Sequence, residues 1–130
     1  MNFIKIKETC LYVEDLETIL EFYSITLNLP VINYLPGKHL FLRAGSSVLL
    51  FFNPEDSREK KSPPAHYGGG KQHVAFEVDR NNYEQTKSEL VSKGIAITEE
   101  VIWKSGEKSF YFEDPAGNVL EIVPDSGIWD

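Results

Sequence analysis

The sequence predicts an α+β domain in which one βαβββ module occurs twice. The two copies are expected to form a curved mixed sheet around a cavity, with the helices on the outer face. Two amphipathic helical segments are each preceded by one strand and followed by three short ones. A Pro- and Gly-rich linker loop at about residues 54–71 separates module one, about residues 4–53, from module two, about residues 72–124. A four-stranded sheet covered by a helix on one face leaves the other face free for a ligand.

The first module begins with a strand over residues 4–13 that alternates in polarity. Asp15 suits the N-cap of a helix, and Asn28 with Pro30 ends it. The apolar stripe of this helix recurs at helical spacing and consists of Leu16, Ile19, Leu20, Tyr23 and Leu27. Three strands are predicted after it, over residues 31–35, 39–43 and 48–52.

The second module repeats this order from a strand at residues 74–78. Asn81 and Glu84 predict a capping box, and Gly94 ends the helix after a buried face of Tyr83, Lys87, Leu90 and Val91. Strands are predicted over residues 95–102, 109–113 and 119–123, with a tight turn over residues 114–118.

Composition narrows the choice of partner to a small molecule or another protein. A formal charge of −7 opposes binding to nucleic acid or anionic lipid, and no run approaches the roughly 18 apolar residues of a membrane span. The single cysteine, Cys10, excludes an internal disulfide and fits a reducing cytoplasmic compartment. The N-terminal residues lack the apolar run of a signal peptide.

Strand alternation places three possible metal ligands on the faces turned away from the helices. Glu8 and His73 hold equivalent positions in the two modules, and Glu121 lies between Leu120 and Ile122 of the last strand. If a pseudo-twofold axis relates the modules, these three side chains converge. One imidazole and two carboxylates can bind a divalent cation and leave positions open for a ligand.

The sequence resembles the vicinal oxygen chelate superfamily, which includes glyoxalase I, extradiol dioxygenases, fosfomycin-inactivating thiol transferases and bleomycin-binding proteins. The resemblance extends over residues 6–124. The runs that carry it are residues 8–13, 15–17 and 21–23, then His73-Val74-Ala75-Phe76 and the closing stretch 111–121.

The resemblance implies that Glu8, His73 and Glu121 occupy three of the family's metal-ligand positions. Members commonly have a histidine where this chain has Glu8, and the fourth position, a carboxylate in glyoxalase I, is Leu50. We therefore expect a three-ligand site for one divalent ion, with Zn, Mn, Ni and Fe left open as its identity. Two carboxylates nearly neutralise such an ion and weaken its pull on a substrate oxygen.

Other side chains are candidates for lining the pocket. They are Cys10, Tyr12, Leu50, Phe52, Trp103 and Tyr111. The plainer interpretation of the aromatic residues is that they pack in the core. The plainer interpretation of Cys10 is that it packs as a small apolar side chain. No catalytic residue is assigned, and the other two histidines, His39 and His66, receive no role.

Two classes of function remain open. The first is a metal-dependent enzyme acting on a small oxygen-bearing molecule, in which the ion stabilises developing oxyanion charge. The second is a metal-free protein that sequesters a drug or metabolite, as bleomycin-binding relatives do. Within the enzyme class, a fosfomycin-type thiol transferase shares the three-ligand count and the loop around Lys104, whose plainer interpretation is a charged hairpin turn. We also expect a homodimer, since two four-stranded sheets have edges to cover.

Overall fold

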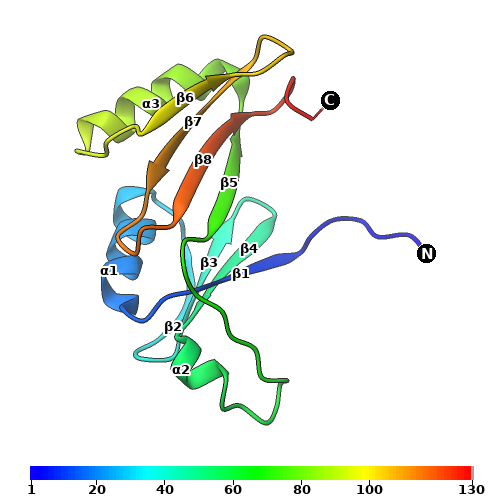
Figure 1. Cartoon of the computed structure of the whole chain (residues 1–130), viewed down its shortest axis with the longest axis vertical. Coiled ribbons are helices and arrows are strands. Elements are labelled where there is room, and N and C mark those ends of the chain that lie inside the picture. The colour runs from blue at the N-terminus through cyan, green and yellow to red at the C-terminus, as the bar shows by residue number, and fades with distance from the viewer. Residues whose placement is uncertain (130) are drawn as a thin grey trace. The chain divides into compact units, whose positions relative to one another are not determined.

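Each half of the chain forms its own four-stranded mixed sheet with a helix on one face (Figure 1). The computed structural model describes residues 1–129, and it divides into unit 1, Met1–Gly70, and unit 2, from Lys71 onward. The predicted α+β class and the two βαβββ modules are confirmed. No helix in residues 1–129 combines the length and the apolar character that a membrane span requires.

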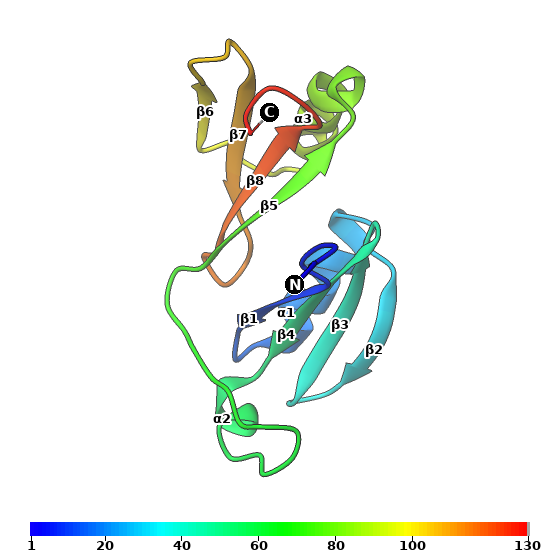
Figure 2. The same cartoon turned by 90° about the vertical axis from the view of Figure 1, so that its right-hand side faces the viewer.

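Unit 1 has the strand order β1-β4-β3-β2, with β1 parallel to β4 and the other pairs antiparallel (Figure 2). Its strands are β1 (Glu8–Tyr12), β2 (Val31–Leu35), β3 (His39–Ala44) and β4 (Ser47–Phe52). Its helices are α1 (Leu16–Glu21), the π-helical turn η1 (Phe22–Thr26) and the one-turn helix α2 (Pro54–Ser57). Helix α2 occupies the start of the predicted linker loop and was not predicted from the sequence.

The core of unit 1 lies between α1 with η1 and one face of the sheet. Tyr23 is fully buried and its ring lies 4.6 Å from that of Phe51 on β4. The other buried residues of this layer are Leu11, Leu16, Ile19, Phe22, Leu40, Leu42 and Leu49. The π-helical turn adds one residue to the helical repeat, so Phe22 and Tyr23 are buried consecutively. A regular 3.6-residue stripe omits Phe22, so the helical period did not predict it as a core residue.

The N-terminus of the first module differs from the prediction. The first strand begins at Glu8, and the predicted strand residues Ile4 and Ile6 are 97% and 77% exposed. The predicted cap is confirmed, because an Asp15 carboxylate oxygen accepts a hydrogen bond from the backbone N–H of Thr18 at 3.3 Å.

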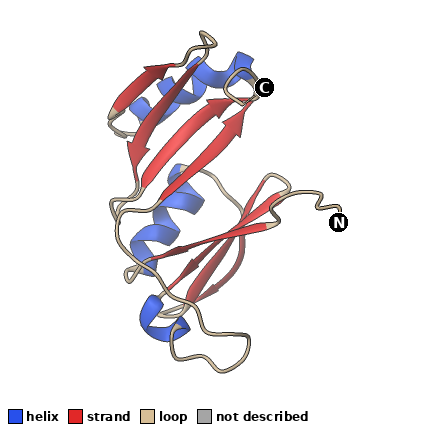
Figure 3. Cartoon of the chain, turned by 45° about the vertical axis from the view of Figure 1, so that its right-hand side comes forward, coloured by secondary structure: helices blue, strands red, loops and turns tan. Residues whose placement is uncertain are grey.

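Unit 2 has the strand order β5-β8-β7-β6, with β5 parallel to β8. Its strands are β5 (His73–Val78), β6 (Glu99–Ile102), β7 (Lys108–Glu113) and β8 (Val119–Pro124). Its helices are the 3₁₀ turn η2 (Arg80–Asn82) and α3 (Tyr83–Ser92), and Figure 3 shows α3 along one face of the sheet. Residues Phe110, Phe112, Leu120 and Ile122 form the buried layer on that face.

Two details of the second helix differ from the prediction. The capping carboxylate belongs to Asp79, which accepts from the backbone N–H of Asn81 at 2.8 Å, so Asn81 lies inside η2 and is not the cap. Val91 is 55% exposed and does not join Tyr83 and Leu90 in the core. The extra 3₁₀ turn rotates the buried face of α3 relative to a helix that starts at Asn81.

The turn between β7 and β8 places the start of β5 beside β8. Asp114 accepts hydrogen bonds from the backbone N–H groups of Ala116 and Asn118, both at 2.9 Å. The buried Asn118 side-chain oxygen in turn accepts from the backbone N–H of Gln72 at 3.1 Å. Gly117 supplies the positive φ of 83° that this turn requires. As a result His73 pairs with Val119.

Candidate functional site

The open face of unit 2, the sheet face turned away from α3, contains two of the three predicted metal ligands. Glu121 on β8 pairs in register with Ala75 on β5 and with Tyr111 on β7. Paired residues of neighbouring strands share a face, and His73 shares that face with Ala75 because it lies two residues before it. This face therefore contains His73, Glu121 and Tyr111.

His73 and Glu121 are in contact. Nε2 of His73 lies 3.3 Å from Oε1 of Glu121, and the carboxylate side chain is 9% exposed whereas the imidazole is 51% exposed. Nδ1 of His73 lies 2.9 Å from the backbone carbonyl oxygen of Val119. A carbonyl oxygen only accepts, so Nδ1 carries a proton and donates it there.

This geometry fits a cation ligand pair. With Nδ1 donating, Nε2 of His73 directs either a lone pair or a proton at Oε1 of Glu121. Two lone pairs at this distance repel, so a proton on Nε2 or a metal ion close to both atoms makes the arrangement favourable. Metal-binding histidines usually donate their second ring N–H to a carbonyl or carboxylate, as His73 does here to Val119.

Tyr111, predicted as a pocket residue, borders this pair. Its ring is stacked on the His73 imidazole, with 6.2 Å between centroids and 29° between planes. Burial raises the pKa of the Tyr111 hydroxyl, and the charge of the nearby Glu121 carboxylate raises it further. Trp103, the other aromatic residue predicted in this unit, follows β6 and donates from Nε1 to Oγ of the buried Ser109 at 2.9 Å.

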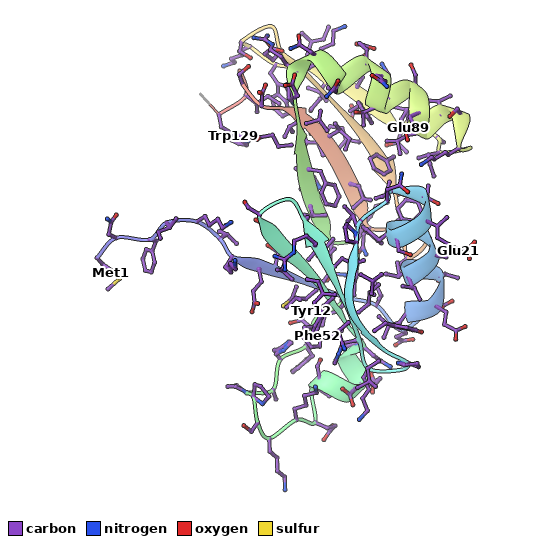
Figure 4. The ribbon with its side chains drawn as sticks, turned by 180° about the vertical axis from the view of Figure 1, so that it is seen from behind. Met1, Tyr12, Glu21, Phe52, Glu89 and Trp129 are labelled. Atoms are coloured by element: carbon purple, nitrogen blue, oxygen red, sulfur yellow. The ribbon has the colours of Figure 1, made fainter. Side chains whose placement is uncertain are left out.

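The open face of unit 1, turned away from α1, contains the remaining predicted residues. Glu8, Cys10 and Tyr12 alternate along β1 and pair in register with Val48, Leu50 and Phe52 of β4. Figure 4 shows Tyr12 and Phe52 side by side at the ends of their strands. Burial raises the pKa of the Cys10 thiol, and the neighbouring Glu8 carboxylate raises it further, which opposes a role as nucleophile.

The strand registers support the predicted equivalence of positions in the two modules. Glu8 opens β1 as His73 opens β5, and their partners Val48 and Val119 are also equivalent. Two residues further along, Cys10 pairs with Leu50 as Ala75 pairs with Glu121. Leu50 thus holds the position in unit 1 that Glu121 holds in unit 2, and it is buried at 7% exposure.

Each unit taken by itself lacks a complete set of ligands. Unit 2 brings His73 and Glu121 together, and Glu8 lies on unit 1. Within either unit, residues 1–129 contain no group of three or more His, Cys, Asp and Glu side chains that could hold an ion.

An aromatic cluster on the open face of unit 1 was only partly predicted. The ring of His39 stacks on Phe41 with 4.1 Å between centroids, and Phe41 lies 5.5 Å from Phe52. The ring centroid of His66 lies 4.6 Å from that of Phe52, with the two ring planes nearly perpendicular. Strand alternation from Phe41 would have placed His39 on this face. Nothing in the local sequence could have placed His66, which lies in the linker loop.

The segment after α2 folds back onto this cluster. Nδ1 of His66 and the hydroxyl of Tyr12 are hydrogen-bonded at 2.8 Å, and Oγ of Ser57 donates to the backbone carbonyl of His66 at 2.6 Å. Gly68 lies so near the Tyr12 ring that an added Cβ would come within 2.9 Å of it. Residues 57–68 therefore pack against the open face of the unit 1 sheet.

The comparisons with known proteins agree with this architecture. A model of the Glyoxalase/Bleomycin resistance protein/Dioxygenase superfamily matches residues 5–122. The chain belongs to this superfamily. A comparison with curated proteins found no significant match.

Several solved structures are similar to this chain. A lactoylglutathione lyase from Agrobacterium tumefaciens is 31% identical, with a TM-score of 0.87 and 93% of each chain covered. A virulence protein from Salmonella typhimurium is 25% identical, with a TM-score of 0.74, covering 95% of this chain and 98% of that one. A glyoxalase/bleomycin resistance protein/dioxygenase from Nocardioides is 20% identical, with a TM-score of 0.77 and coverage of 100% and 91%, and it shows the fold alone.

Proposed function

We propose that this superfamily member is a divalent-metal-dependent enzyme that acts on a small oxygen-bearing molecule. His73 and Glu121 are the first two ligands, and Glu8 is the third. The observation that carries the proposal is the contact between Nε2 of His73 and Oε1 of Glu121 at 3.3 Å, with Nδ1 of His73 donating to a backbone carbonyl. This orientation leaves Nε2 as the nitrogen available to an ion.

The third ligand is proposed from positional equivalence. Glu8 opens β1 in the register in which His73 opens β5. The side chain of Glu8 is exposed, and a carboxylate is a common ligand for Zn²⁺, Mn²⁺ and Fe²⁺. It comes either from the same chain or from a second copy in the proposed homodimer.

The ion would act as a Lewis acid on a substrate oxygen. The chain's own residues orient the site: the Val119 carbonyl holds the His73 ring through Nδ1, and Tyr111 stacks against that ring. Leu50 stands at the family's fourth ligand position, where its buried apolar side chain cannot bind an ion. The substrate is a small oxygen-bearing molecule. We propose a reducing cytosol as the compartment, because a single cysteine cannot form an internal disulfide.

Isothermal titration calorimetry with Zn²⁺, Mn²⁺, Ni²⁺ and Fe²⁺ tests the proposal. The native protein should bind one ion per chain, and His73→Ala should abolish binding without lowering Tm, since the imidazole is half exposed. His66→Ala is the matched control, because that histidine is bonded to Tyr12 in unit 1 and should not affect binding. Absence of binding by the native protein, or unchanged binding by His73→Ala, contradicts the proposal.

The second candidate is a metal-free protein that sequesters a planar ligand. The observation that favours it is the aromatic cluster of Tyr12, His39, Phe41 and Phe52 on the open face of unit 1, since stacked rings bind flat apolar molecules. This function becomes the leading one if the native protein binds none of the four metals. Fluorescence or calorimetric titration with bleomycin would then be the first measurement.

A further inference from the structure

The aromatic cluster on the open face of unit 1 is already occupied by a ring of the same chain. His66 belongs to residues 57–68, which we call the strap, and its ring centroid lies 4.6 Å from that of Phe52, with 89° between the planes. The same ring lies 5.8 Å from that of Tyr12, and its Nδ1 is hydrogen-bonded to the Tyr12 hydroxyl at 2.8 Å. Edge-to-face packing and a hydrogen bond to a ring nitrogen are the contacts by which a binding site recognises a planar heterocycle.

The strap is attached near its two ends, and its middle is exposed. At its start, Ser57 is fully buried and its Oγ donates to the backbone carbonyl of His66 at 2.6 Å. At its end, Gly68 packs closely against the Tyr12 ring. Residues 61–65 between these points are exposed. Release of the His66 ring from the sheet therefore loosens the whole loop.

The surroundings of Phe52 favour a neutral polar ring over a hydrocarbon or an ion. The ring centroid of His39 lies 6.1 Å from that of Phe52, and Nδ1 of His39 is buried with no hydrogen-bond partner among residues 1–129. A buried polar atom without a partner is unfavourable, and a polar ligand can supply one. Lys60 Nζ lies 5.9 Å from the Phe52 ring centroid, but Oδ2 of Asp56 lies 3.7 Å from it, so the two charges offset each other.

We infer that the aromatic cluster binds a small, neutral, planar nitrogen heterocycle in the place of the His66 ring, with a ring nitrogen of the ligand hydrogen-bonded to Tyr12. Ligand and strap compete for this place, so binding releases the strap from the sheet. The competition lowers the apparent affinity by the fraction of molecules in which the place is open. This inference rests on the second candidate function and is independent of the metal site, because every residue that it uses lies in unit 1.

The competition is tested with benzimidazole, a planar heterocycle that has the two ring nitrogens of imidazole and a larger apolar area. Isothermal titration calorimetry measures its affinity for the native protein and for two neighbouring glycine variants. Gly68→Ala places a Cβ within 2.9 Å of the Tyr12 ring and pushes the strap away, so the affinity should rise about tenfold. Gly69→Ala is the matched control and should retain the native affinity, since a Cβ there meets nothing within 4 Å.

Two further variants test the place and the hydrogen bond. His66→Ala removes the occupant and should also bind benzimidazole about tenfold more tightly, which keeps the competition testable if Gly68→Ala fails to fold. Adding Tyr12→Phe to His66→Ala removes the hydroxyl and should weaken binding about fivefold, the usual effect of one hydrogen bond. Adding Tyr67→Phe instead is the matched control and should change nothing, because the Tyr67 ring lies under Arg58.

Limited trypsin digestion reports the release of the strap, which contains Arg58, Lys60 and Lys61. Saturating benzimidazole should accelerate cleavage at these residues several-fold in the native protein, because the ligand displaces the His66 ring. In His66→Ala the cleavage should be fast with or without the ligand. A cleavage rate of the native protein that does not change with ligand contradicts the competition.

The outcomes distinguish the inference from both candidate functions. Equal benzimidazole affinities of the native protein, Gly68→Ala and His66→Ala overturn the competition and leave the second candidate standing. Binding that is unchanged by the loss of the Tyr12 hydroxyl overturns the assigned place. If neither the native protein nor His66→Ala binds benzimidazole, the inference is overturned, whereas the bleomycin and metal titrations still decide between the two functions.

Discussion

The imidazole of His73 faces the carboxylate of Glu121 at 3.3 Å, from two parallel neighbouring strands of one sheet. The parallel pairing of β5 with β8, set by the Asp114–Asn118 turn, brings these residues together. In the proposed metal site this pair supplies two ligands, and the third is proposed to be Glu8 of unit 1. The identity of that third ligand then decides how strongly each metal binds.

Replacing Glu8 by histidine should strengthen binding of Ni²⁺ and Zn²⁺. An imidazole suits these ions better than a carboxylate does, and the site would then have two histidines and one carboxylate. We expect an increase of about tenfold, which corresponds to ~1.4 kcal/mol of binding free energy. Calorimetry on Glu8→His and Glu8→Ala measures it, and the alanine variant should bind more weakly than the native protein. Unchanged affinities in both variants would remove Glu8 from the site.

The native protein should show negligible isomerase activity with glutathione and methylglyoxal, although a lactoylglutathione lyase is among the similar structures. Leu50 occupies the position equivalent to Glu121, and an isobutyl group can neither bind an ion nor accept a proton. General-base catalysis of this kind contributes roughly 10² to 10⁴ in rate. Thioester formation, followed with each metal added in turn, is the assay. Efficient turnover would show that Leu50 does not stand at the missing ligand position.

Glu100 should make unit 2 sensitive to acid. The hydrogen bond from Lys87 Nζ at 2.9 Å lowers the pKa of the Glu100 carboxyl, and the bond from Tyr83 lowers it further. A carboxyl whose pKa is lowered in the folded state adds stability above its ordinary pKa, near 4.5, and this stability is lost as the pH falls through the lowered value.

Thermal unfolding of Glu100→Gln from pH 7 to pH 3 tests this prediction. The variant should be about 1 kcal/mol less stable at pH 7, and its difference from the native protein should shrink below about pH 4.5. Glu84→Gln, at an exposed position of α3, is the control and should parallel the native curve. A difference that is constant with pH would exclude the ionised Glu100 as its cause.

Tyr12 should hold residues 58–68 against the open face of unit 1. Tyr12→Phe removes the hydroxyl bonded to Nδ1 of His66. This change should lower the free energy that holds the segment on the sheet by about 1 kcal/mol. Limited trypsin digestion measures it, because Arg58, Lys60 and Lys61 lie in this segment. Cleavage there should be several-fold faster in Tyr12→Phe. The Tyr67→Phe control retains the ring under Arg58 and should be cut at the native rate.

The protein should be a homodimer. Each sheet taken by itself has two edge strands, and the edge strand β2 exposes three apolar residues, Val31, Ile32 and Leu35. Exposed apolar edges are commonly covered by a second copy across a twofold axis. Light scattering at micromolar concentration should return twice the chain mass of 14.8 kDa. A monomer mass across this range would contradict the prediction.

Local periodicity was sufficient to predict the two modules and the direction of most strand side chains. Alternation in β1, β5 and β8 placed Glu8, His73 and Glu121 opposite the helices, and the observed registers agree with that placement. These features follow from a period of two along a strand, which adjacent residues alone determine. The same reasoning identified Leu50 as the equivalent of Glu121.

Only the tertiary structure decided which distant groups meet. The bond between His66 and Tyr12, and the bond from Trp103 to Ser109, join residues from different segments, and no periodicity encodes such pairs. The start of the second helix and the phase of the first also escaped prediction. At Asp79 a 3₁₀ turn precedes α3, and at Phe22 a π-helical turn changes the repeat, because burial of large side chains overrides the regular 3.6-residue period.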